Sequence, residues 1–407
     1  MRTCVATAGA VAVVLLAAMP ASAAPYVVVL KPAVGATIDT TAQRTGVTPR
    51  QRWTSALQGF SADLDSAQRA RLASDPAVAY VGPDTAITAA GASVPLATGE
   101  LVPPGIRRIG AATTALVHGA TASAVAILDT GADLANADLN VAGGVNCVKP
   151  GAQPLDDNGH GTHVAGIVAA RNDGLGVTGV APGTPVYAVK VLNNKSTGTL
   201  SQLLCGLDWV SANAAALAIR VANMSISGTG ANDNDCGATN KDAEHKAICG
   251  LKDAGVTVVA AAGNSAKSFA TTIPAAYPEV LTATAMTDTD GVPGARGAAP
   301  ACRKTEKDDT AGTYSNYAPN TTDAAHTIAA PGTCVVSDKP GGGTAIYYGT
   351  SQAAPHVAGA LALCLEGPCS GLAPAQSIAR VRADALAGSF TGPAGRTYGP
   401  LVSAAAY

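Results

Sequence analysis

Charged residues are scarce in this sequence, and neither sign of charge dominates. Only 13% of the 407 residues are charged, against 47% that are hydrophobic, and the formal net charge is −2 at pH 7. Because proteins that bind nucleic acid gather Lys and Arg on one face, this balance argues against a nucleic-acid partner. A chain of this length and hydrophobic content can bury a sizeable core, and we expect more than one domain.

Long apolar runs are also missing, with one exception near the N-terminus. Residues 5–19 are mostly apolar, follow Arg2, and precede the small-residue pattern Ala21-Ser22-Ala23. The run is shorter than the roughly 20 apolar residues that a membrane span needs, which favours a signal peptide over a membrane anchor. We therefore expect residues 1–23 to be removed, and the mature protein to be secreted, extracellular and not bound to a membrane.

No two cysteines have the Cys-x-x-Cys spacing of a zinc site. Of the nine cysteines, Cys4 lies in the expected signal peptide, and the even number that remains in an exported chain predicts disulfides. Sequence proximity favours three pairs and leaves a fourth by elimination: Cys236 with Cys249, Cys302 with Cys334, Cys364 with Cys369, and Cys147 with Cys205.

Residues 25–87 and the stretch after them differ in composition and in sequence pattern. Residues 25–87 contain no cysteine and have the pattern of a strand at 26–30, a helix at 66–72 and a second strand at 77–81. About sixty residues make a marginal core, so such a unit often depends on a partner. Residues 85–104, rich in Ala, Gly, Thr and Pro, are expected to be a weakly structured linker.

From about residue 106, short β-like runs alternate with helical ones. The strand candidates are 124–128, 186–191, 221–224, 256–261, 280–285 and 327–330. The helix candidates are 163–170, 200–218, 243–253 and 357–365. Near-continuous apolar strands that alternate with helices indicate a parallel sheet covered on both faces, and reacting groups are expected at the carboxyl ends of its strands.

A serine follows a glycine towards the C-terminal end of the chain. The run Gly349-Thr350-Ser351 precedes an Ala- and Leu-rich stretch, 357–365, with helical composition. Ser351 is therefore expected at or near a helix N-terminus, where the partial positive charge favours a developing anion. The alternative is a capping serine with no chemical role.

Three further polar residues lie where strands end or helices begin. Asp129 ends an apolar run, His160 stands between two glycines ahead of a helical stretch, and Asn264 follows another apolar run. Taken singly, the Asp and the Asn are ordinary turn residues. The alternative for His160 is metal binding together with His163, but no nearby Glu or third ligand of the zincin kind is present.

In the order Asp129, His160, Asn264 and Ser351, these motifs resemble the subtilisin-like serine proteases, the subtilases. Further segments resemble the family: 102–106, 314–317 and 329–332. The resemblance divides the chain into a signal peptide (1–23), an inhibitor-like propeptide and linker (24–100), and a catalytic domain (101–407). It implies an α/β fold of three layers, a mainly parallel central sheet with helices on both faces, preceded by a small α+β propeptide domain. The exported, disulfide-containing character resembles the proteinase K branch most closely.

The resemblance assigns a role to each of the four residues. Ser351 would attack the peptide carbonyl, and His160 would take its proton and later protonate the leaving amine. Asp129 would hold the imidazole and stabilise its charged form. The side chain of Asn264 and the backbone N–H of Ser351 would stabilise the oxyanion. No cofactor is needed for this chemistry, and the substrates would be proteins or peptides.

Substrate binding is implied for two stretches. Ser225, Ile226, Ser227 and Gly228 resemble the family segment that lines the primary specificity pocket and pairs with an extended substrate, and Ala261, Ala262 and Gly263 are assigned to the same site. Residues 195–200 are expected to form the opposite rim. Ser227 replaces the first of two family glycines, and no acidic residue favours basic substrates, so we expect apolar or broad specificity. Gln352 stands where subtilases commonly carry Met.

The resemblance also implies the oligomeric state and the partners of the protein, and two loops suggest calcium. It implies a monomer made as a self-processing zymogen, whose own propeptide acts as intramolecular chaperone and inhibitor. The loops 232–235 and 288–291 offer oxygen ligands for structural calcium, but neither has the spacing of an EF-hand, so an ordinary polar loop remains the alternative. Two other functions stay open: a transferase or ligase on the same fold, and a non-catalytic binding protein, which the presence of all four active-site residues disfavours.

Overall fold

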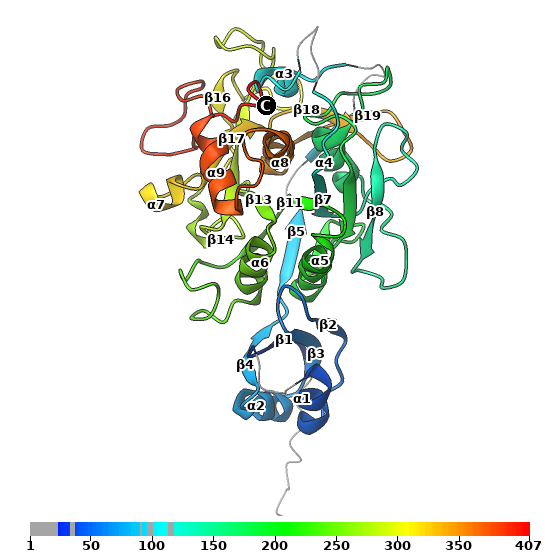
Figure 1. Ribbon diagram of the computed structural model, residues 1–407. Coiled ribbons are helices and arrows are strands. Elements are labelled where there is room, and N and C mark those ends of the chain that lie inside the picture. Colours follow the sequence, from blue (N-terminus) through cyan, green and yellow to red (C-terminus); the bar gives the residue numbers. More distant parts are fainter. Residues whose placement is uncertain (1–22, 33–36, 90–91, 96–100, 113–117) are drawn as a thin grey trace, which may run out of the picture.

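The computed structural model describes residues 23–32, 37–89, 92–95, 101–112 and 118–407. The expected signal peptide, residues 1–23, lies outside these ranges except for its last residue. Within them, none of the helices combines the length and the apolar content that a bilayer crossing requires. Two regions are visible in Figure 1, a small unit near the N-terminus and a larger body that carries the C-terminus.

The small unit is an antiparallel sheet with helices on one face. Its strand order is β2-β3-β1-β4. The elements in chain order are β1 (Ala24–Leu30), α1 (Ile38–Thr45), β2 (Gln51–Trp53), β3 (Gly59–Leu64), α2 (Ser66–Ser74) and β4 (Val78–Pro83). The predicted pattern of strand, helix and strand is confirmed in β1, α2 and β4, and three elements that the sequence did not single out complete the unit.

Alternate residues of β1 face two different cores. Val28 and Leu30 pack with Leu72 of α2 in the core of the small unit. Val27 and Val29 belong instead to a core of the body. Because successive strand residues point to opposite faces, one face of this sheet is covered by its own helices and the other by the body. The sheet therefore joins the two regions.

The body contains an eight-stranded sheet in the order β16-β15-β13-β11-β7-β9-β8, with β17 beside β15. All pairs are parallel except that of β15 with β16. The strands are β7 (Ala124–Asp129), β8 (Val141–Asn146), β9 (Val186–Lys190), β11 (Ile219–Met224), β13 (Thr257–Ala261), β15 (Val280–Thr287), β16 (Thr310–Ala311) and β17 (Thr327–Pro331). The prediction of a mainly parallel sheet is confirmed.

Helices cover both faces of this sheet (Figure 1). One face packs against α4 (His160–Ala169), α8 (Thr350–Glu366) and α9 (Pro374–Ala383), and the other against α5 (Leu200–Asn213) and α6 (Ala243–Asp253). Along β7, Val125 and Ile127 enter the first core, whereas Ala126 and Leu128 enter the second. The strand is apolar throughout because both of its faces are buried. This is the predicted three-layer α/β fold.

Shorter elements complete the chain. They are β5 (Ala86–Ala89), β6 (Ala92–Pro95), α3 (Pro104–Arg108), β10 (Thr197–Thr199), β12 (Ile226–Thr229), the 3₁₀ turn η1 (Phe269–Thr271), β14 (Thr272–Ile273), α7 (Thr321–Ala324), β18 (Val335–Asp338) and β19 (Thr344–Tyr348). The expectation of a weakly structured linker at 85–104 is wrong for β5 and β6. Both are strands because β10 and β12 pair with β5 and because β19 pairs with β6, and these partners lie more than a hundred residues away in sequence.

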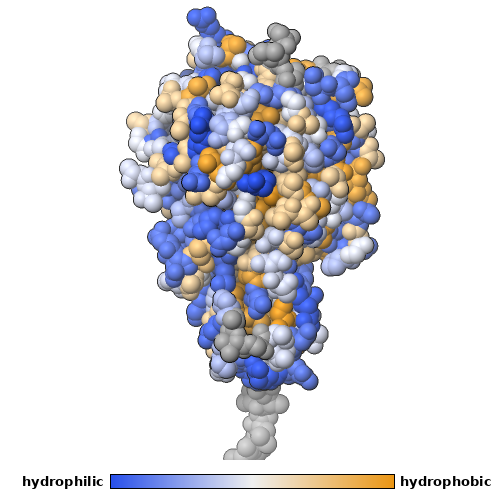
Figure 2. Space-filling model, viewed as in Figure 1, coloured by the Kyte–Doolittle hydropathy of each residue, from blue (hydrophilic) through white to orange (hydrophobic). Residues whose placement is uncertain are grey.

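The four disulfides all lie in the body. They pair Cys147 with Cys205, Cys236 with Cys249, Cys302 with Cys334, and Cys364 with Cys369, which confirms the predicted set. On the face shown in Figure 2, polar and apolar residues are interspersed over both regions, as a chain with few charges requires.

Candidate active site

Asp129 and His160 form a buried pair at the edge of the sheet. Asp129 is the last residue of β7, and His160 is the first residue of α4, directly after Gly159 in a left-handed conformation (φ 110°). The ring Nδ1 of His160 lies 2.8 and 2.9 Å from the two carboxylate oxygens of Asp129. These contacts assign the Nδ1 proton to the bond with Asp129, so in the neutral ring the lone pair that can accept a proton lies on Nε2.

The turn around Ser351 is hydrogen-bonded to Ser225, the residue between β11 and β12. Helix α8 begins at Thr350, seven residues before the stretch that composition indicates, and it continues through Pro355. Proline has no N–H to donate to the carbonyl of Ser351 one turn earlier. The hydroxyl of Ser225 donates to that carbonyl instead (2.7 Å), and the hydroxyl of Ser351 donates to the carbonyl of Ser225 (3.1 Å). Two serines far apart in sequence thereby fix each other.

Asn264 is oriented by the same helix end. Its side-chain oxygen accepts hydrogen bonds from the backbone N–H (2.8 Å) and the hydroxyl (3.0 Å) of Thr350. The backbone N–H of Gly263 donates to the Thr350 hydroxyl (3.0 Å). Because the amide oxygen is engaged, the side-chain NH₂ of Asn264 is the group that can donate to a ligand.

The expected substrate residues gather around this turn. Ser225 contacts Ser351, and the following residues Ile226, Ser227 and Gly228 lie on β12. Ala261 ends β13, and Ala262 and Gly263 lead from it to Asn264. The expected opposite rim, residues 195–200, contains β10, and β5 pairs with both β10 and β12.

His163 does not form a metal pair with His160. Its ring is stacked on Tyr347 with a centroid distance of 4.2 Å, and its Nε2 lies 3.1 Å from the carbonyl oxygen of Val335. Burial first, and then the charge of His160, lowers the pKa of His163 to about 3, so it is neutral at ordinary pH. Its contacts are those of a structural histidine.

Two residues of this site were not found from the sequence. Asp156 accepts hydrogen bonds from Gly159, Thr162 and Thr130 and so holds the entry to α4. The ring of Tyr347 lies 6.3 Å from that of His160 and precedes Ser351 by four residues. A carboxylate shortly before a helix start is a capping signal that could have identified Asp156. No local pattern marks Tyr347.

Gln352 is completely buried beside Ser351. Among the described residues, neither its amide oxygen nor its amide nitrogen has a hydrogen-bond partner. Unpaired polar groups in a core are unfavourable, so this side chain is an energetic defect next to the nucleophile candidate.

The two candidate calcium loops have protein partners for their carboxylates. In the loop 232–235, Asp233 accepts from three backbone N–H groups and lies beside His245. In the loop 288–291, buried Asp288 lies 2.9 Å from the Nε of Arg108 and accepts from the N–H of Gly291. Burial raises the pKa of Asp288 to about 7. Asp288 also groups with Asp290 and Asp308, whose carboxylate ligand atoms lie within 4.8 Å of one another, so structural calcium at this loop stays a prediction.

The buried Asp–His pair and the serine at a helix end, at one edge of a mainly parallel sheet, define a serine-hydrolase type of α/β protein. The subtilase family profile matches residues 120–386, and the chain belongs to this family. It is therefore a subtilisin-type serine protease by family. The proteinase K branch stays a prediction.

Similar proteins agree with this assignment. Alkaline elastase YaB of Bacillus sp. (strain YaB) is 36% identical over 306 residues, which cover 75% of this chain and 68% of that protein. Subtilisin E of Bacillus subtilis (strain 168) is 33% identical over 313 residues, 76% of this chain and 71% of that protein. A solved structure of a cold-adapted subtilisin-like serine proteinase has a TM-score of 0.57 and 26% identity, covering 74% of this chain and 98% of the other.

Proposed function

We propose that this chain is a secreted serine endopeptidase that hydrolyses proteins through an acyl-enzyme, with Asp129, His160 and Ser351 as the catalytic triad. The observation that carries the proposal is the approach of His160 Nδ1 to both oxygens of the buried Asp129, within 2.9 Å. A histidine held in this tautomer can remove the proton of Ser351 as its Oγ attacks the peptide carbonyl. It then gives that proton to the leaving amine.

The negative charge of the tetrahedral intermediate needs donors that are already aligned. The Asn264 NH₂ is suited to this role because Thr350 fixes the other end of the same amide. The backbone N–H of Ser351, at the positive end of α8, is the second donor. No metal or organic cofactor takes part in these steps.

The small unit acts as propeptide, chaperone and inhibitor of the body. Strand β5 lies antiparallel between β10 and β12, as an extended substrate would, with Thr88 opposite Ser227 and Ala89 opposite Ile226. The interface is also held by carboxylates from both sides. Asp208 of α5 accepts from the N–H groups of residues 54–56 at 2.5 to 3.1 Å, and Asp84 accepts from the N–H of Ser201 at 2.6 Å.

Self-processing would separate β5 from β6. Ala89 pairs with Ile226, the neighbour of Ser225, whereas Ala92 pairs with Tyr348, three residues before Ser351. The described ends of β5 and β6 thus pair with residues next to the turn at Ser351. We keep the division into signal peptide (1–23), propeptide and linker (24–100) and catalytic domain (101–407), with the cut in the linker. N-terminal sequencing of the mature enzyme tests this position.

Specificity follows from the strand edges and not from a charged pocket. Backbone pairing by β10 and β12 does not depend on side-chain type, which favours broad or apolar cleavage preference. We propose that the mature enzyme is an extracellular monomer of the proteinase K-like type. Structural calcium stays open, and the carboxylates of Asp288, Asp290 and Asp308 are the group that would bind it.

The test is digestion of casein by the purified protein, with and without a serine-directed covalent inhibitor. We expect hydrolysis that the inhibitor abolishes. Transfer of the acyl group to an added amine in preference to water would identify a transferase or ligase. No reaction with casein or the inhibitor would favour a binding protein.

A further inference from the structure

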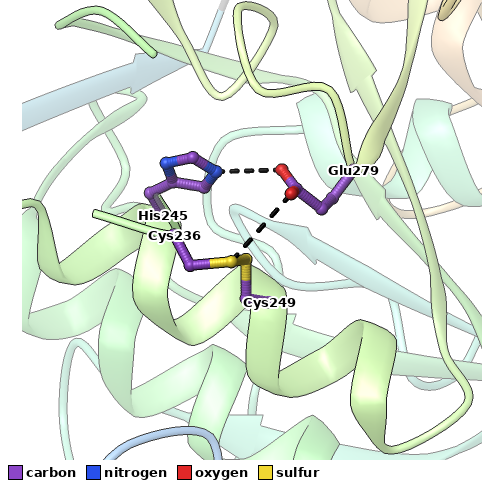
Figure 3. A group of neighbouring side chains, drawn as sticks. All are labelled: Cys236, His245, Cys249 and Glu279. Atoms are coloured by element: carbon purple, nitrogen blue, oxygen red, sulfur yellow. Dashed lines mark hydrogen bonds and ion pairs between the residues drawn. A yellow bond between two sulfur atoms is a disulfide. The ribbon is translucent and has the colours of Figure 1, made fainter. Parts of the chain in front are cut away.

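A second cluster of reactive side chains lies away from the active site, at α6 (Figure 3). Cys236, His245, Cys249 and Glu279 each place one ligand atom within 4.8 Å of the others. His245 and Cys249 are four residues apart on α6 and so share one face of the helix. Cys236 comes from the loop before α6, and Glu279 directly precedes β15. In the oxidised protein Cys236 and Cys249 form a disulfide.

His245 is held as zinc-bound histidines are held. The Nε2 atom of its ring lies 2.9 Å from a carboxylate oxygen of Glu279 (Figure 3). The Nδ1 atom lies 3.2 Å from a carboxylate oxygen of Asp233. The ring is stacked on Tyr277 at a centroid distance of 4.1 Å. In protein zinc sites the ring nitrogen that does not bind the metal usually contacts a carboxylate, which fixes the orientation of the ring. Asp233 is that carboxylate here.

Asp233 is held in place for this orienting role. Its carboxylate accepts hydrogen bonds from the backbone N–H groups of Asp235, Gly237 and Asn240. The loop that carries Cys236 is wrapped around this carboxylate. Reduction of the disulfide therefore leaves the loop anchored, and Cys236 stays close to α6.

We propose that the dithiol form of this cluster binds one zinc ion through Cys236 Sγ, Cys249 Sγ, His245 Nε2 and a Glu279 oxygen. Two sulfurs, one imidazole nitrogen and one carboxylate oxygen are a ligand set that zinc accepts in four-coordinate sites. The disulfide and the metal exclude each other, because a cysteine sulfur binds zinc as a thiolate and not as part of a disulfide. The same two sulfurs thus cross-link the loop to α6 in either redox state.

The exchange between the two states is balanced. A dithiol reductant supplies two electrons and two protons to the Cys236–Cys249 bond and is oxidised to its own disulfide. Zinc then displaces the protons of both thiols, so two protons leave for each metal ion bound. Reoxidation by a disulfide reverses these steps and releases the metal.

The other three disulfides provide the comparison. Among the described residues, no other cysteine pair belongs to a group of His, Cys, Asp and Glu ligand atoms this close together. Cys302–Cys334 is a suitable control because it also joins distant segments of the body. Its replacement should leave metal binding at α6 unchanged.

The experiment uses full-length Ser351→Ala protein, reduced and then freed of reductant without oxygen. Cobalt(II) is added as a spectroscopic substitute for zinc. We expect one metal per reduced chain with a thiolate-to-cobalt charge-transfer band, loss of the band on adding zinc, and no band in oxidised protein. Cys302→Ser/Cys334→Ser should behave as the parent. His245→Ala should bind at least about tenfold more weakly, and Asp233→Asn about 10–100-fold more weakly.

If full reduction unfolds the chain, the variant Cys249→Ser still tests the proposal. Cys249→Ser frees Cys236 without reductant and leaves the other three disulfides intact. It should bind cobalt with one thiolate, and Cys249→Ser/His245→Ala should bind it at least about tenfold more weakly. The proposal is overturned if folded, reduced parent binds no metal. It is equally overturned if Cys249→Ser binds none, or if loss of His245 leaves the affinity unchanged.

Discussion

The small unit and the body hold their folds by different means. The body has a core on each face of its sheet and four disulfides, whereas the small unit has one core of nine buried residues and no cysteine. The second face of the small sheet is buried because residues of this unit, among them Val27, Val29 and Tyr80, join a core of the body. A sheet with one face covered from outside is not independent, so we expect the unit to fold fully only when docked.

The largest effect is expected at Ser351, because this serine would cut the chain between the two regions. Ser351→Ala should lower turnover by about 10⁶-fold, the size of the loss for the nucleophile of subtilisin. The small unit should then stay covalently joined to the body, because self-processing uses the same serine. Casein hydrolysis and the mass of the purified chain measure both effects. Ser403→Ala, distant in sequence from the turn at Ser351, is the control and should mature normally. Maturation of Ser351→Ala in a protease-free host would contradict self-processing.

The second prediction concerns chemistry within the body. Asn264→Ala should lower kcat by about 10²–10³-fold, as loss of this donor does in subtilisin, with little change in KM. The reason is that the amide would bind the oxyanion and not the ground-state carbonyl. Steady-state kinetics on a peptide substrate measures the changes in kcat and KM separately. A change confined to KM would show that Asn264 only binds substrate.

The third prediction breaks the contact between the regions. Asp208→Ala removes the carboxylate that accepts three N–H groups of residues 54–56. Leaving these donors unpaired should weaken docking by about 3 kcal/mol, or roughly a hundredfold. The measurement is inhibition of the mature enzyme by added residues 25–95. Asp253→Ala, at the exposed end of α6, is the matched control. Equal inhibition of both variants would reject this account of the interface.

The fourth prediction uses the pH dependence of docking. Glu244 is buried in α6 and lines a cavity of about 300 Å³ together with Tyr80 of the small unit. Burial, assisted by the charge of Asp242, raises the pKa of Glu244 well above 4.5. Lys241 also borders this cavity, and the phenol of Tyr277 lies near both acids.

The direction in which docking changes with pH follows from the raised pKa of Glu244. The docked state keeps a proton that a hydrated Glu244 would lose, so docking is fully favourable below pH 4.5 and weakens as the pH rises towards the raised value. The inhibition constant should rise by up to about tenfold per pH unit in this window. In Glu244→Gln this slope should vanish. An unchanged slope in the variant would place the titrating group elsewhere.

The smallest expected effect is at Gln352. Gln352→Met removes a buried amide without partners and should stabilise the body by about 1–3 kcal/mol, measured by thermal unfolding. The same change should make activity sensitive to peroxide, because a thioether beside the oxyanion site oxidises to a polar sulfoxide. Met224 and Met286 are fully buried, and mass spectrometry can check that they stay unoxidised. Equal, rapid inactivation of parent and variant would refute this role.

The contrast between the regions also explains what the sequence could predict. The strands β7, β11, β13 and β15 were predictable because both of their faces are apolar, and Asp129 and Asn264 were found because they follow such strands. Helix α5 was expected to reach residue 218 but ends at Asn213, since the Ala-rich continuation forms turns before β11. Favourable helix composition does not by itself fix a boundary.

Features that depend on distant partners were not predictable. The start of α8 at Thr350 depends on the hydroxyl of Ser225, and the strand β5 depends on edges of β10 and β12. Tyr347 of β19 lies near His160 although the two residues are far apart in sequence. In each case the sequence contains the residue but no local pattern that identifies its partner.

Covalent labelling with a serine-directed inhibitor tests the central claim most directly. The mature protein is treated with a sulfonyl fluoride, digested, and mapped by mass spectrometry while residual casein hydrolysis is followed. We predict one label per chain, on Ser351, with activity lost in proportion to labelling, and no labelling at this serine in His160→Ala. A label on another serine, or full activity after stoichiometric labelling of Ser351, would contradict the account.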